Sequence, residues 1–305
     1  MEGQVMKSTG SWYEVITKDK KIFLCRVRGK FRIKGIRVTN PVAVGDHVKF
    51  KLIDTDEGVI EKIFQRKNYL IRRAIKKSAD GQILAANIDQ AVLVATTTLP
   101  RTSTGFIDRF LVAADSFRIP SVLVFNKSDL WDDSAKNQVM ELINIYESIG
   151  VDFLCTSAEK KDNIDIFRKK LDGKLSLIAG HSGVGKSSLL NLLAPHIQQK
   201  TAEISSFANK GVHTTTFAEM FDIGNNSYVI DTPGIKELGL MDIYDEELSH
   251  FFPEMRALFG KCKYHNCTHM HEPGCAVLDA VEKGEIALSR YYSYLSIMEE
   301  EETHR

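Results

Sequence analysis

The most constraining feature of this 305-residue chain is a glycine-rich segment, residues 180–187, with the sequence Gly-His-Ser-Gly-Val-Gly-Lys-Ser. It fits the pattern G-x-x-x-x-G-K-[ST] in full, follows the apolar stretch 175–179 and precedes a helix-length stretch. In that context the glycines let backbone N–H groups turn toward phosphate oxygens, and the helix N-terminus adds a partial positive charge. The sequence therefore predicts a nucleotide-binding phosphate loop formed by Gly180, His181, Ser182, Gly183, Val184, Gly185, Lys186, Ser187 and Ser188.

Two side chains of this loop and a later motif predict a magnesium–phosphate site. Lys186 is expected to neutralise the β- and γ-phosphates during catalysis, and the Ser187 hydroxyl is expected to ligate Mg²⁺. Asp231 ends the apolar stretch 227–230 and opens the motif Asp-Thr-Pro-Gly. A carboxylate at a strand end can hold Mg²⁺ through water, and the backbone N–H of Gly234 can meet the γ-phosphate.

The segment 211–216, Gly-Val-His-Thr-Thr-Thr, lies between these two motifs, where a switch segment is expected. Thr215 is expected to complete the Mg²⁺ shell, and Thr214 is an open alternative. Ile235 occupies the position at which Ras-like proteins carry the glutamine that orients the attacking water. An aliphatic side chain cannot do this, so we expect slow intrinsic turnover and either His213 or a partner as the replacement.

A base-reading site is predicted earlier in the chain. Asn126, Lys127, Ser128 and Asp129 follow the apolar stretch 122–125. A carboxylate at the fourth position can accept hydrogen bonds from the N1–H and 2-amino group of guanine, which adenine does not offer, and an unpaired buried acceptor costs about 1–3 kcal/mol. The segment Thr156, Ser157 and Ala158 follows the next apolar stretch, 152–155, and can present a backbone N–H to the guanine O6. Together with the phosphate loop, these residues predict a binding site for GTP and GDP.

From residue 88 the chain alternates buried-type strands with helix-length segments, which predicts a doubly wound α/β domain with a mostly parallel sheet. Strands are expected at 88–95, 122–125, 152–155 and 175–179, and helices at 105–117, 134–148, 163–171 and from 186. The base readers precede the phosphate loop, whereas ordinary small GTPases carry them last. A circular permutation explains this order, with residues 172–173 as the link that rejoins the former ends.

The first quarter of the chain has a different character. Residues 1–77 hold 19 Lys/Arg against 8 Asp/Glu, a net charge of +11, and the remainder has a net charge of −11. Short strands are expected at 12–17, 22–27, 47–53 and 58–64, and about five strands in this length predict an OB-like or SH3-like barrel. Basic residues recur at mostly alternate positions, so several can share one RNA-binding face: Arg26, Arg28, Lys30, Arg32, Lys34 and Arg37.

After residue 242 the α/β pattern stops and a cysteine–histidine cluster appears. Cys262, Cys267, His269 and Cys275 offer three thiolates and an imidazole, a closed tetrahedral zinc set with a structural role. His265 and His271 are alternative nitrogen ligands. Helical segments are expected at 276–281 and 286–298, so this part of the chain is a helical zinc-binding domain.

Composition excludes several other classes. The chain is 43% hydrophobic and 26% charged, which is a globular balance. No apolar run approaches the ~18 residues that span a bilayer, and the polar start, 1–13, lacks the apolar middle of a secretory signal. We therefore expect a soluble cytoplasmic protein with no membrane partner, and nothing in the sequence indicates more than a monomer.

These motifs together resemble one known family. The permuted order, the Gly-x-His-Thr-Thr segment, the aliphatic residue after Asp-Thr-Pro-Gly and the Cys-x₄-Cys-x-His-x₅-Cys cluster are similar to those of the RsgA family, also called YjeQ or YloQ. The resemblance covers nearly the whole chain, with a barrel at 1–70, a GTPase domain at 71–242 and a zinc domain at 243–305. It implies a GTPase that binds the 30S subunit and its 16S rRNA late in assembly and is stimulated by the subunit.

A second reading has no ribosomal partner. The same features fit a nucleotide-gated module that binds RNA or protein, in which GTP hydrolysis is incidental. Contacts to rRNA phosphates should weaken by orders of magnitude between low and moderate salt, whereas a contact to protein alone should not.

Overall fold

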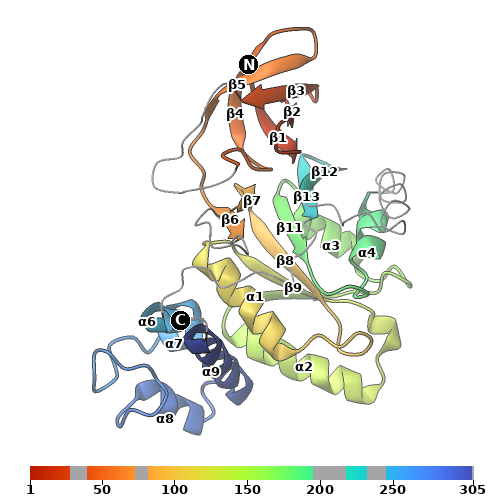
Figure 1. Ribbon diagram of the computed structural model, residues 1–305. Coiled ribbons are helices and arrows are strands. Elements are labelled where there is room, and N and C mark those ends of the chain that lie inside the picture. Colours follow the sequence, from red (N-terminus) through yellow and green to blue (C-terminus); the bar gives the residue numbers. More distant parts are fainter. Residues whose placement is uncertain (28–39, 73–81, 195–217, 232–244, 304–305) are drawn as a thin grey trace.

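The computed structural model describes residues 1–27, 40–72, 82–194, 218–231 and 245–303. Figure 1 shows three bodies in chain order, namely an N-terminal β-barrel, a central α/β body and a C-terminal helical module. Among the described residues, no helix is both long and apolar enough to cross a membrane.

The N-terminal body is a closed five-stranded barrel. Its strands pair in the order β1-β2-β3-β5-β4 and β4 returns to β1, with β3 and β5 parallel, which is an OB-type rather than an SH3-type topology. The strands are β1 (Glu2–Ser8), β2 (Tyr13–Ile16), β3 (Ile22–Val27), β4 (His47–Leu52) and β5 (Glu57–Ile63). The sequence predicts strands only from residue 11, and β1 corrects this. Only Val5 and Ser8 are buried along β1, so its sequence shows no clear alternation.

The central body is built on a sheet with the order β10-β9-β8-β11-β13-β12. Its strands are β8 (Gln90–Ala95), β9 (Ser121–Phe125), β10 (Asp152–Cys155), β11 (Leu175–Ala179), β12 (Glu219–Gly224) and β13 (Ser227–Asp231). All neighbours are parallel except β12 and β13, and the sequence did not predict the antiparallel strand β12. Because β11 inserts between the earlier β8 and the later β13, the structure has the permuted connectivity that the motif order predicts.

Helices cover both faces of this sheet. The helices are α1 (Thr104–Ser116), α2 (Asp133–Ser148), α3 (Ile164–Leu171) and α4 (Lys186–Leu193), with a short 3₁₀ turn, η1 (Ser128–Leu130). Alternate residues of β8 enter opposite cores: Leu93 packs in the core that α1 and α2 close, and Val92 in the core that α3 and α4 close. A strand buried on both faces reads as a continuous apolar run, which is why these strands were predictable.

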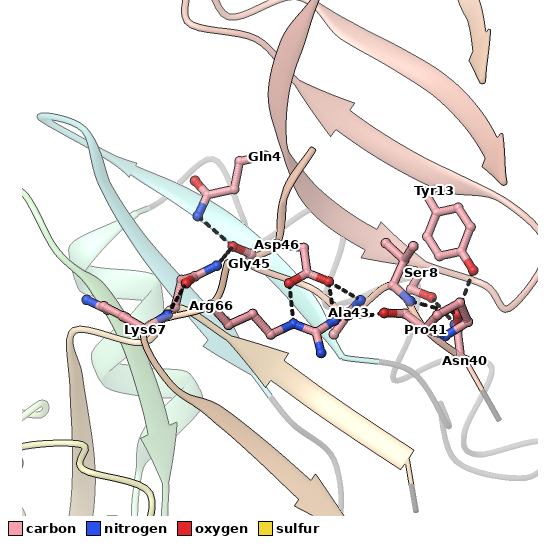
Figure 2. Close-up of polar contacts among 12 residues, drawn as sticks. Gln4, Ser8, Tyr13, Asn40, Pro41, Ala43, Gly45, Asp46, Arg66 and Lys67 are labelled. Atoms are coloured by element: carbon pink, nitrogen blue, oxygen red, sulfur yellow. Dashed lines mark hydrogen bonds and ion pairs between the residues drawn. The ribbon is translucent and has the colours of Figure 1, made fainter. Parts of the chain in front are cut away.

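The barrel and the central body are joined by a hairpin and a buried polar junction. β6 (Tyr69–Arg72) pairs with β7 (Gln82–Ala86), a hairpin that the sequence did not predict. Figure 2 shows the junction, where Arg66 after β5 donates two 2.6 Å hydrogen bonds to the fully buried carboxylate of Asp46. Asn87 Nδ2 donates to Gly45 O at 3.0 Å. A Cβ at Gly45 would lie 2.1 Å from Ala86 O, so only glycine permits this close approach.

The C-terminal module packs on α1. Its elements are α6 (Asp245–Leu248), η4 (Ser249–Phe251), α7 (Pro253–Arg256), α8 (Ala276–Glu282) and α9 (Leu288–Thr303). Arg290 of α9 is 1% exposed, and it donates to Asp108 of α1 at 2.7 Å and to Glu254 at 2.7 and 3.2 Å. Burial raises the pKa of Asp108, and the guanidinium of Arg290 opposes that rise. This buried cluster fixes the module to the central body.

Candidate functional site

The phosphate loop lies where the sequence predicts it, between β11 and α4. Gly183 and Gly185 have φ angles of 85° and 95°, in the left-handed region that favours glycine. A Cβ at Gly180 would lie 2.3 Å from Val94 O, and one at Gly185 would lie 2.3 Å from Asn126 Nδ2. The glycines therefore let the loop turn and lie directly against the end of β8 and against the base-reading motif.

Lys186 begins α4 and points back into the loop. Its Nζ donates to Gly180 O at 2.7 Å and to His181 O at 2.8 Å. Ser187 and Ser188 follow in the first turn of α4 and are exposed. The ammonium group thus lies at the helix N-terminus inside a loop of backbone groups, an arrangement that can receive phosphate oxygens.

Asn126 connects the base-reading motif to the phosphate loop. Its side chain is buried at the end of β9, and its Nδ2 donates to Val184 O at 2.9 Å. Its Oδ1 accepts from Thr156 Oγ1 at 3.0 Å and from the backbone N of Ala158 at 3.2 Å. One amide therefore holds together three segments that the sequence separates, and Thr156 is a member of this network.

Asp129 and Ser157 also lie together, since the Ser157 hydroxyl donates to Asp129 Oδ1. Lys127 has a left-handed backbone, with φ of 65°, and its Nζ donates to Leu99 O at 2.6 Å. Ser128 N donates to Thr156 O at 3.0 Å. The two predicted base-reading segments therefore form one surface beside the phosphate loop.

The sequence reasoning missed the loop between β8 and α1. A Cβ at Gly183 would lie 3.4 Å from Pro100 Cδ, and the rings of Phe106 and His181 have centroids 3.9 Å apart. These contacts support the phosphate loop from the side of α1. No local signal marks them, because the partners lie far apart in the sequence.

Asp231 is the last residue of β13, and its backbone is in register with Ile178, two residues before the phosphate loop begins. The end of β13 therefore lies beside the loop. His213, Thr214, Thr215, Gly234 and Ile235 lie outside the described residues, so their predicted roles remain predictions.

A second site lies in the C-terminal module. The ligand atoms of Cys262, Cys267, His269 and Cys275 all lie within 4.8 Å of one another, so this set can hold a metal ion. His269 Nδ1 is 3.6 Å from Cys262 Sγ and 3.4 Å from Cys275 Sγ. Zinc bonds of about 2.3 Å to sulfur and about 2.0 Å to nitrogen give a tetrahedral S···N edge of about 3.5 Å. The separations therefore fit zinc, and the set contains neither of the alternative histidines.

Neighbouring groups orient this cluster. Glu272 accepts from the backbone N and the hydroxyl of Thr268, each at 2.6 Å, and Tyr291 OH donates to His269 O at 2.8 Å. Burial lowers the pKa of His269, which favours the neutral imidazole that a metal requires. Burial raises the pKa of the Cys267 thiol to about 12, so metal binding would release its proton.

Comparison with known proteins agrees with this geometry. A model of the RsgA GTPase family matches residues 63–241, and a model of the RsgA N-terminal domain matches residues 2–60. A small ribosomal subunit biogenesis GTPase RsgA 2 of Bacteroides thetaiotaomicron is 51% identical over 302 residues, which cover 99% of this chain and 97% of the relative. An RsgA of Cytophaga hutchinsonii is 49% identical over 307 residues and is matched over 100% of both chains.

Two solved structures share the fold. The crystal structure of YjeQ from Thermotoga maritima matches with a TM-score of 0.77 and 38% identity, covering 98% of this chain and 97% of the other. YloQ, described as a circularly permuted GTPase, matches with a TM-score of 0.77 and 32% identity, covering 100% of this chain and 96% of the other. The chain therefore belongs to the RsgA family of circularly permuted GTPases.

Proposed function

We propose that this GTPase acts in the assembly of the small ribosomal subunit, binding the 30S particle through its 16S rRNA. The observation that carries the proposal is the match along the whole chain, from barrel to C-terminal module, to relatives named for small ribosomal subunit biogenesis. In this proposal the chain works as a cytoplasmic monomer with three domains, at 1–70, 71–242 and 243–305.

The contacts of the described residues support the proposed nucleotide roles. Asp129 reads the N1–H and 2-amino edge of guanine, and the Ser157 hydroxyl that donates to it keeps its carboxylate oriented. The segment of Ser157 and Ala158 is proposed to lie beside the guanine O6, and Asn126, which accepts from the Ala158 N–H and donates to Val184 O, holds this segment against the phosphate loop. The residues assigned to GTP and GDP are Asn126, Lys127, Ser128, Asp129, Ser157, Ala158, Gly180, His181, Ser182, Gly183, Val184, Gly185, Lys186, Ser187, Ser188, Asp231 and Gly234.

Hydrolysis needs charge neutralised on the phosphates and a positioned water. Lys186 would leave the carbonyls of Gly180 and His181 to bind the β- and γ-phosphates. Ser187, Thr215 and Asp231 are the proposed holders of Mg²⁺, which supplies neutralisation of phosphate charge when bound. His213 is the proposed substitute for the missing glutamine, and Thr215 is proposed to contribute to catalysis through its contact with Mg²⁺.

The two flanking bodies are proposed to contact the particle. On the outer face of the barrel, Arg26 of β3 lies over the ring of Trp12, 5.1 Å from its centroid, an arrangement suited to stacking against an exposed base. Arg28, Lys30 and Arg32 follow in the sequence and supply phosphate contacts in this proposal. The C-terminal cluster is proposed to hold one structural zinc ion, because four protein ligands leave no position for water.

The test is GTP hydrolysis by the purified protein alone and with 30S subunits, 50S subunits or free rRNA. We expect strong, salt-sensitive stimulation by 30S subunits alone. The Lys186→Ala variant reports contaminating activity in each mixture. Equal, slow rates in every mixture would overturn the ribosomal role and leave the GTPase assignment intact.

A second experiment locates the RNA contact. The triple substitution Arg28→Ala, Lys30→Ala and Arg32→Ala should weaken 30S binding and leave GTP binding unchanged. Loss of both activities together would contradict a separate RNA-binding barrel.

A further inference from the structure

The strands of the barrel and the strands that lead into the nucleotide-site loops belong to one continuous sheet. β1 of the barrel pairs with β12, so a single ladder of eleven strands runs from β10 to β4. One row of registered residues crosses the boundary between the bodies and follows the order Leu24, Glu14, Lys7, Glu219, Asp231 and Ile178. The row begins at Leu24 in β3 of the barrel. It ends at Ile178 in β11, two residues before the phosphate loop.

The boundary itself is a pair of charged residues. Lys7 and Glu219 are backbone partners, and their side chains form an ion pair with a 3.2 Å Nζ···O distance. The side chain of Glu219 is 15% exposed and that of Lys7 is 35% exposed, so the pair is shielded more than most surface pairs. Among the described residues, it is the one registered pair between β1 of the barrel and β12 of the central body.

A second lysine of the barrel, Lys20, forms hydrogen bonds with the β12–β13 hairpin at the end opposite Glu219. β12 and β13 form an antiparallel hairpin, and Lys20 of the barrel donates to Asp222 Oδ2 at 2.8 Å and to Tyr228 OH at 2.6 Å. Lys7 holds the end at which Glu219 is in register with Asp231, and Lys20 holds the end near the turn. The barrel therefore contacts both ends of this hairpin, whose last residue is Asp231.

We propose that Lys7 and Glu219 form a positioning pair, which holds the Asp231 end of β13 for nucleotide binding and couples it to occupancy of the barrel. The coupling half rests on the proposed RNA binding by the barrel, whereas the positioning half does not. If a bound polyanion and a bound nucleotide favour the same placement of the hairpin, each raises the affinity of the other by the same factor. Neither residue touches nucleotide in this scheme, since both act through the backbone register of β12 and β13.

The first measurement uses the full-length protein without RNA. The dissociation constant of a fluorescent, non-hydrolysable GTP analogue is measured with Mg²⁺ for Lys7→Glu, Glu219→Lys and the double swap. We expect each single variant to bind about 3- to 10-fold more weakly, and the double swap to return within about twofold of the wild type, which corresponds to about 0.4 kcal/mol. Single variants that bind as tightly as the wild type would overturn the proposal, as would a double swap that stays as weak as the singles.

A matched control distinguishes loss of the Lys7–Glu219 ion pair from the general effect of changing a charge on the barrel. Lys21→Glu makes the same charge change on the same barrel, where the described residues place the Lys21 ammonium 3.8 Å from the exposed carboxylate of Asp19. We expect no change in analogue binding, and an effect as large as that of Lys7→Glu would overturn the assignment. If Lys7→Glu does not fold, as judged by its thermal unfolding, Lys7→Met replaces it, because Met retains the apolar stem.

The second measurement tests the coupling with purified 30S subunits as the probe. We expect the wild type to bind them at least fivefold more tightly with the GTP analogue than with GDP, and each single swap to reduce this ratio below about twofold. A ratio that survives the single swaps would overturn the coupling. A wild type that binds 30S subunits in neither state refutes the proposed function and the coupling with it, and the first measurement still decides whether the pair positions the hairpin.

Discussion

Truncation of Asn126 should damage nucleotide binding more than any other single change outside the phosphate loop. The side chain is 1% exposed and bonds two other segments, the phosphate loop at Val184 and the second base-reading segment at Thr156 and Ala158. Asn126→Ala removes the 2.9 Å bond to Val184 O, the 3.0 Å bond from Thr156 Oγ1 and the 3.2 Å bond from the N–H of Ala158. The phosphate loop and the second base-reading segment lose their common support in one step.

The magnitude follows from the burial of the groups left behind. Val184 and Thr156 are both fully buried, so two polar groups lose a partner that water cannot easily replace. Each such group costs about 1–3 kcal/mol, so the two together cost about 2–6 kcal/mol. Both loops must return to this arrangement when the nucleotide binds, so the cost falls on binding. Since 1.4 kcal/mol is a factor of ten, GDP should bind about 30- to 20,000-fold more weakly.

The assay is equilibrium titration with a fluorescent GDP, with thermal unfolding as a check that the variant is folded. Thr156→Val removes one of the three bonds and should cost about 1 kcal/mol, or about fivefold in affinity. Thr156→Ser keeps the hydroxyl and is the matched control, expected within twofold of the wild type. A folded Asn126→Ala variant that binds GDP within threefold of the wild type would refute the reasoning.

Three further predictions concern the base, the metal and the domain contact. Asp129→Asn should weaken GDP binding by about 10- to 100-fold and favour xanthine nucleotides, which carry a carbonyl where guanine has its amino group. Competition binding between the two nucleotides measures this change, and an unchanged preference for GDP would contradict the prediction. Cys262→Ser should lower bound zinc well below the one ion per chain expected of the wild type, by metal analysis; full retention contradicts a four-ligand site. Arg290→Ala should lower the free energy of unfolding by about 3–5 kcal/mol, because it leaves the Asp108 carboxylate buried without its cation. The control Arg256→Ala removes one partner of a half-exposed ion pair and should cost about 0–1 kcal/mol. Equal losses of thermal stability in the two variants would contradict this.

The parts of the site that the sequence predicted are those whose geometry is local. Gly183 and Gly185 take left-handed backbone angles within a few residues of Lys186. The spacing of glycines and lysine in the sequence therefore predicts the backbone conformation of the loop. The four metal ligands lie within fourteen residues, and a tetrahedral ion constrains their spacing in the same way. Short-range patterns of this kind can be interpreted without knowing the rest of the fold.

The parts that the sequence did not reveal depend on distant partners. Arg290 lies 182 positions from Asp108 and 36 from Glu254, and nothing near any of them marks a buried cluster. β1 carries little apolar periodicity, because it is stabilised through its neighbours β2, β4 and β12 rather than through a continuous apolar face. Such features come from the tertiary arrangement, which overrides local propensity.

The insertion of β11 between β8 and β13 has a consequence while the chain is being synthesised. Of the central strands, β8, β9 and β10 leave the ribosome first, yet the partner of the free edge of β8 is β11, residues 175–179, and the next parallel strand ends at residue 231. Until residues 175–179 have emerged, the apolar edge of β8 is an open template for other strands. A nascent chain whose emerged part ends between residues 155 and 175 exposes that edge, so chaperone binding should concentrate at this stage, and released products truncated in this interval should aggregate.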